Sequence, residues 1–125
     1  MKMIPLILAV SVQAETLPKV SPAYVNAVRS YAHCIEAKMV ELEPSKAGID
    51  DIFEAAETQC AGAWGDSVLI LQDEFEKTAP APSGKTPGQL SIEILDGVAS
   101  SAKDRARVTI LRKRAGLPPI DVKKL

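Results

Sequence analysis

Two cysteines placed evenly about a predicted turn constrain the fold of this chain more than any other feature. Cys34 and Cys60 each lie thirteen residues from Ala47, which belongs to a short turn-like segment at residues 45–48. An antiparallel helical hairpin brings together residues that are equidistant from its turn, so both thiols would lie about 20 Å along their helices from it. The spacing therefore predicts a helical hairpin that is closed by a Cys34–Cys60 disulfide.

The alternative to this disulfide is a pair of reduced, buried cysteines. A bond requires the two α-carbons to approach within roughly 4.4–6.8 Å, which facing helices with small neighbouring residues allow. Closing a loop of this length would stabilise the fold by about 3.5 kcal/mol. The two residues do not form a Cys-x-x-Cys motif, so their spacing does not indicate a catalytic redox role.

The first fourteen residues have the layout of a short secretory signal. Lys2 precedes an apolar stretch at residues 4–10, and Val12-Gln13-Ala14 places small residues where signal peptidase cleaves. A buried N-terminal helix or strand is the alternative. The apolar stretch is shorter than the ~20 residues that span a bilayer. The sequence therefore predicts a bacterial export signal at residues 1–14, a periplasmic or secreted location, and a single helical domain at residues 15–125.

Three helices are predicted, at about residues 22–43, 48–77 and 87–115, with a Pro/Gly-rich linker at residues 78–86. A Ser-Pro pair opens the first helix and a Thr-Pro pair opens the third, and both pairs suit helix starts. The fold class predicted is all-α, with a disulfide-stapled antiparallel hairpin and a third long helix, similar to a three-helix bundle. The apolar stripe of the third helix is Leu90, Ile94, Val98, Ala102, Ala106 and Ile110, with Leu95 and Leu111 beside it.

Two glycines lie inside the second predicted helix. Gly62 and Gly65 flank Ala63 and Trp64, and each glycine costs about 1 kcal/mol of helix stability relative to alanine. Two explanations are open: a neighbouring helix approaches closely at this point, or the helix kinks there.

Charge is divided unevenly along the chain. Residues 15–86 contain six Lys/Arg and twelve Asp/Glu, whereas residues 87–125 contain eight and four. One interpretation is that the basic third helix packs against the acidic hairpin, so that its arginines pair within the chain. The other is a contact surface for an acidic protein or, less favoured, an anionic membrane. The residues of this candidate surface are Arg105, Arg107, Arg112, Lys113 and Arg114.

No motif predicts a cofactor, a metal site or a catalytic residue. His33 is the only histidine, so it cannot build a multi-histidine site, and no Gly-x-Ser-x-Gly motif accompanies it. The carboxylates near residues 50–57 fit the start of a helix better than a calcium loop. The basic run lacks interleaved aromatic residues on which bases could stack, so no nucleic acid partner is expected.

These patterns favour a small exported, non-catalytic helical module with a protein-interaction or structural role. Long helices with few aromatic residues also suit a homo-oligomer. Two other classes stay open. A carrier would hold a small apolar ligand between helices near Trp64, Val68 and Leu71, and an enzyme would need carboxylates with raised pKa that converge in a concave site.

Overall fold

The computed structural model describes residues 21–77 and 84–120, and within these residues the chain contains helices and no strands. The all-α fold class predicted from the sequence is confirmed. The predicted signal at residues 1–14 and most of the linker at residues 78–86 lie outside the described residues. The elements are α2 (Pro22–Leu42), the 3-10 turn η1 (Glu43–Ser45), α3 (Ile49–Gln59), α4 (Ala61–Glu76) and α5 (Pro87–Arg114).

Local sequence sets the start and the end of α2. The Ser21 hydroxyl accepts a hydrogen bond from the backbone N–H of Tyr24 at 3.1 Å, and Pro22 occupies the first helical position. Pro44 cannot continue the helix, and the chain tightens there into η1. Lys46 then adopts a left-handed conformation with φ of 58°, which turns the chain toward α3.

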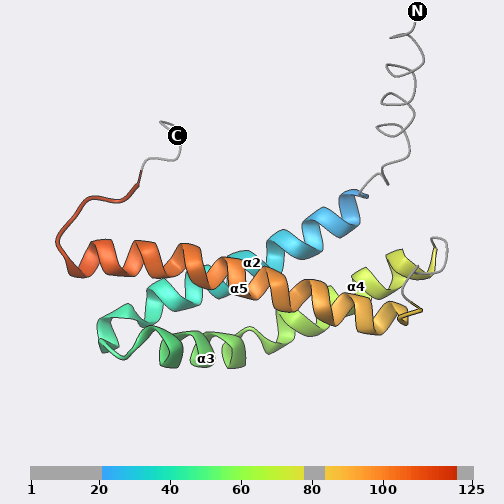
Figure 1. The fold of residues 1–125 in the computed structure, drawn as a ribbon, viewed down its shortest axis with the longest axis horizontal. Coiled ribbons are helices and arrows are strands. Elements are labelled where there is room, and N and C mark those ends of the chain that lie inside the picture. The colour runs from blue at the N-terminus through green and yellow to red at the C-terminus, as the bar shows by residue number, and fades with distance from the viewer. Residues whose placement is uncertain (1–20, 78–83, 121–125) are drawn as a thin grey trace, which may run out of the picture.

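The second helix predicted from the sequence, residues 48–77, is two helices in the structure. Cys60 separates α3 from α4, and its φ of −94° and ψ of 12° leave the helical region. Figure 1 shows α3 running below α5, while α4 runs in a different direction and rises past α5 toward the right. A methyl group added at Gly62 or Gly65 would meet no atom within 4 Å. The close approach of a neighbouring helix therefore does not explain the two glycines. The chain instead changes direction at Cys60, two residues before Gly62.

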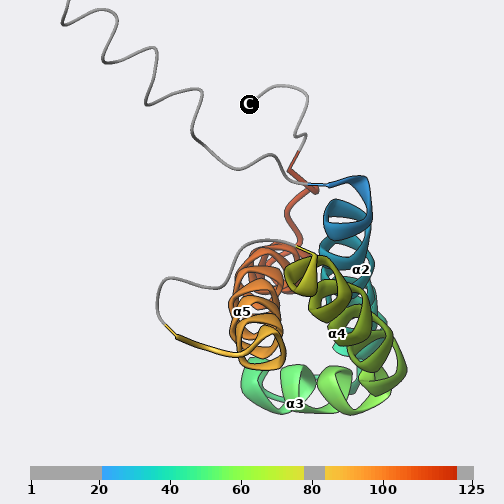
Figure 2. The same cartoon turned by 90° about the vertical axis from the view of Figure 1, so that its right-hand side faces the viewer.

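The third predicted helix forms as a single element, α5. Its start is a capping box: the Gln89 N–H donates to the Thr86 hydroxyl at 3.1 Å, and the Thr86 N–H donates to the Gln89 side-chain oxygen at 2.9 Å. Gly116 ends the helix with φ of 73°, as a left-handed stop requires. Figure 1 shows α5 extending along the bundle, and Figure 2 shows α2 and α4 to the right of α5 and α3 below it.

The core lies between α2, α5 and the α3–α4 pair. Its largest fully buried side chains are aliphatic and come from every helix: Ile35, Met39, Ile52, Leu71, Leu95 and Ile110. Small residues fill the rest of the seam along α5, where Ala99, Ala102 and Ala106 are buried. The buried stripe of α5 thus passes through Leu95 and Ala99, whereas the predicted stripe passed through Ile94 and Val98, which are only half-buried.

Candidate functional site

The Cys34–Cys60 disulfide is confirmed. It joins α2 to the junction between α3 and α4, with a distance of 6.0 Å between the two α-carbons, inside the range that a disulfide allows. Cys60 is buried and Cys34 is half-buried at the edge of the core. The bond therefore fastens the point at which the second half of the hairpin changes direction, and it holds the end of α3 and the start of α4 against α2.

Most of the basic residues in the candidate contact surface have partners within the chain. Arg105 pairs with Glu36 on α2, with 2.5 Å between Nε and Oε1. The Arg114 guanidinium donates to the Ala47 carbonyl at 2.9 Å. The Arg112 Nε–H donates to the Pro118 carbonyl at 2.8 Å. The contacts of Arg105 and Arg114 favour the interpretation in which the third helix pairs with the hairpin, although Arg105 meets the first helix and not the acidic second one. The contact of Arg112 is local to the end of α5.

Glu43 forms the most buried of these ionic contacts. Only 7% of its surface is exposed. Lys113 lies 3.5 Å and Arg114 lies 3.7 Å from its carboxylate oxygens. A buried carboxylate requires such compensation because its desolvation is costly. The two cations therefore fasten the end of α5 to the turn of the hairpin, which is a structural role.

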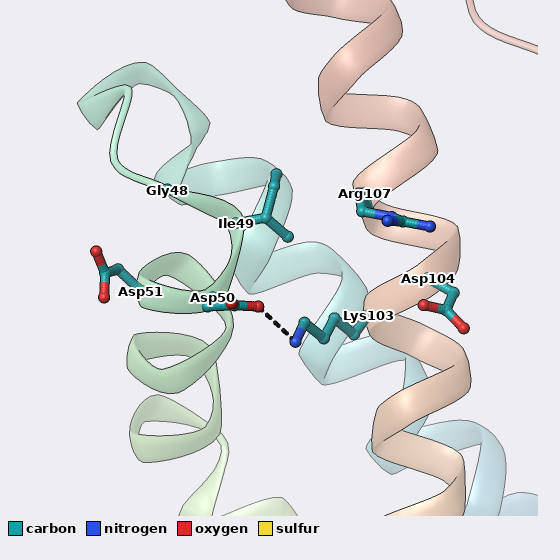
Figure 3. Close-up of a pocket in the computed structure, with 7 residues that line it drawn as sticks. All are labelled: Gly48, Ile49, Asp50, Asp51, Lys103, Asp104 and Arg107. Atoms are coloured by element: carbon teal, nitrogen blue, oxygen red, sulfur yellow. Dashed lines mark ion pairs between the residues drawn. The ribbon is translucent and has the colours of Figure 1, made fainter.

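Arg107 differs from its neighbours, because it makes no hydrogen bond or ion pair with residues 21–77 or 84–120. It borders an open cleft of about 600 Å³ between the start of α3 and the middle of α5. Figure 3 shows this cleft, with Lys103 reaching across it to Asp50 while Asp51 and Asp104 point away. The other residues that line the cleft are Gly48 and Ile49. None of these contacts tests whether the basic residues form a contact surface for a partner, so that surface stays a prediction.

The electrostatics of the cleft are those of an exposed ion pair. The Lys103 ammonium lies 2.6 Å from an Asp50 carboxylate oxygen and 5.0 Å from the centre of the Phe53 ring. The hydrogen bond from Lys103, the charge of Lys103 and the charge of Arg107 lower the pKa of Asp50. A general acid needs the opposite shift. Asp50 therefore suits a contact between α3 and α5 better than acid catalysis.

The residues of the predicted apolar pocket belong to the core. Leu71 has no exposed surface, and Trp64 and Val68 are half-buried and pack against the core cluster. None of the three lines the cleft between α3 and α5. The carrier hypothesis is not tested by this arrangement and stays a prediction.

An apolar outer face of α5 was not anticipated from the sequence. Leu111, which was expected beside the core stripe, is 50% exposed, and Val108 is 41% exposed. Leu117 and Ile120, beyond the end of the helix, are also exposed. The signal that could have revealed this face is a second set of residues in the sequence with spacings of three and four, out of phase with the first.

His33 is exposed on α2. Across residues 21–77 and 84–120, no three side chains of His, Cys, Asp or Glu converge in a way that could hold a metal ion. No helix in that part of the chain has the length and apolar character needed to cross a membrane. Comparisons with protein-family models, curated proteins and solved structures find no match to this chain.

Proposed function

We propose that this chain is an exported helical module that acts by binding another protein chain and carries out no catalysis. The observation that carries this proposal is the outer face of α5, where Val108 and Leu111 expose apolar surface near the end of the helix that Lys113 and Arg114 hold against the hairpin turn. Apolar side chains that gather on one rigid face are typical of protein contact surfaces.

Export is the second component of the proposal. The Cys34–Cys60 disulfide persists in an oxidising compartment, whereas cytosolic thiols are kept reduced. The export signal predicted for residues 1–14 would deliver the chain to such a compartment, where the disulfide compensates for a modest core.

Site-specific photo-crosslinking in the native cell tests both components. A photoreactive phenylalanine analogue replaces Leu111 in one strain. In a matched control strain it replaces Leu69, an equally apolar residue that is 67% exposed on α4. The proposal expects a discrete crosslinked product from position 111 and none from position 69. It also expects mature protein whose mass begins at Glu15.

Two results would contradict the proposal. Absence of any crosslinked product from position 111 would remove the contact surface. Recovery of a cytosolic chain that retains Met1 and carries two free thiols would remove export.

A further inference from the structure

α5 carries a second stripe of side chains on the face opposite the core. Residues 102, 106 and 110 are buried, whereas Asp104 and Val108 between them and Leu111 after them are exposed. Toward the start of the helix the same stripe continues through Ser101 and Gly97, which are exposed, and through Ile94 and Leu90, which are half-buried; Ile94 also packs against the edge of the core. Successive spacings alternate between three and four residues, which is the seven-residue repeat of paired helices. Figure 2 shows that no described helix covers this side of α5.

The order of side chains in this outer stripe is nearly the same in both directions from a point between Ser100 and Ser101. Leu90 mirrors Leu111 at the two ends, Ile94 comes within one position of mirroring Val108, and Gly97, Ser101 and Asp104 occupy the centre. In an antiparallel pair of identical helices, mirrored positions lie opposite each other. Large apolar side chains would therefore meet at both ends, and the small central residues would let the helix axes approach closely where they cross.

Charges along the edge of the outer stripe have the same symmetry with opposite sign. Glu93 and Arg107 each lie seven residues from Ser100, so an antiparallel second copy places the carboxylate of one chain beside the guanidinium of the other, twice. A parallel pair would place Arg107 beside Arg107 instead. Arg107 forms no hydrogen bond and no ion pair with the described residues of its own chain, although its charge acts on Asp50 at longer range. Glu93 is exposed and pairs with Lys85.

We infer that a second copy of this chain docks antiparallel along the outer stripe of α5 and forms a twofold symmetric dimer. The inference rests on the proposed function, because it names the partner for the same face. The contact would extend for about 30 Å, from Leu90 to Leu111. Asp104, which points away from α3 (Figure 3), would face Gly97 and Ser101 of the second copy. A polar group at the centre of such a seam fixes the register of two helices.

A charge exchange tests the dimer and its direction together. Analytical ultracentrifugation of the mature, disulfide-bonded chain should give the mass of two chains at high concentration. Glu93→Arg alone, or Arg107→Glu alone, should raise the dissociation constant by about tenfold, because each change acts twice in a symmetric contact. The double variant that carries both changes should recover dimerisation. Within one chain the two residues are fourteen positions apart, about 21 Å, so only contact between copies explains that recovery.

Leu111→Glu should abolish the dimer, and the matched change Leu69→Glu on α4 should leave it intact. Melting curves followed by circular dichroism show that each variant is folded, since all of these positions are exposed. A wild-type chain that stays monomeric up to about 1 mM, a concentration that exposes even weak association, overturns the dimer. Failure of the double charge variant to recover overturns the antiparallel arrangement.

The failure of this inference and that of the proposed function give different results. If the purified chain is monomeric but position 111 crosslinks to a different protein in the cell, the dimer is wrong and the proposed function stands. If position 111 crosslinks to nothing, the proposed function is wrong as well.

Discussion

Reduction of the disulfide is the perturbation whose size the structure defines best. Cys34 and Cys60 are 26 residues apart in the sequence. Closing a loop of this length restricts the unfolded chain, which stabilises the folded state by about 3.5 kcal/mol. The free energy of unfolding of a domain of this size is about 5–15 kcal/mol. The disulfide thus contributes a large share of the stability.

The assay is thermal unfolding followed by circular dichroism, with and without a strong reductant. In a domain of about 100 residues each kcal/mol shifts the Tm by roughly 4–8 °C, so reduction should lower the Tm by roughly 15–25 °C. The matched control carries Cys34→Ala and Cys60→Ala together. Its Tm should be low and should not respond to reductant, because it has no bond to break.

The reasoning is refuted if complete reduction, verified by counting two free thiols in denatured protein, leaves the Tm of the wild-type chain unchanged. A shift of only a few degrees would show that the unfolded chain is already restricted near the turn of the hairpin. A Tm change in the alanine control would show that the reductant acts on something other than the disulfide.

Two other predictions follow from single contacts. Ile110→Ala should lower the free energy of unfolding by about 2–5 kcal/mol because Ile110 is buried. The matched change Leu111→Ala should lower it by less than about 1 kcal/mol. Urea unfolding of both variants measures the two losses, and equal losses would contradict the assignment of a buried and an exposed face to α5. The lowered pKa of Asp50 means that its pairing with Lys103 stabilises the fold above the unfolded pKa of about 4 and is lost as pH falls through the folded value. The Tm difference between the wild-type chain and Lys103→Met should therefore shrink below about pH 4, and a difference that stays constant down to pH 2 would exclude this pairing.

The sequence by itself determined the features that depend on neighbours within a few residues. The caps at Ser21 and Thr86 act over a single helical turn, and the structure has both of them where the sequence placed them. The disulfide joins residues that are distant in the sequence. In an antiparallel hairpin, however, two residues that lie the same number of positions from the turn face each other. For this reason Cys34 and Cys60 could be paired before the structure was known.

Only the tertiary structure decided the features that depend on which faces of two helices meet. The break at Cys60 has no proline or cap to announce it, and it follows from packing both α3 and α4 against α2. The sequence contains several carboxylates with which Arg105 could pair. The rotation of α5 about its axis in the bundle determines that it pairs with Glu36. The same rotation buries Leu95 and exposes Leu111. Periodicity defines a stripe on an isolated helix, but the angle at which that helix docks determines which of its stripes faces the core and which remains open for a partner.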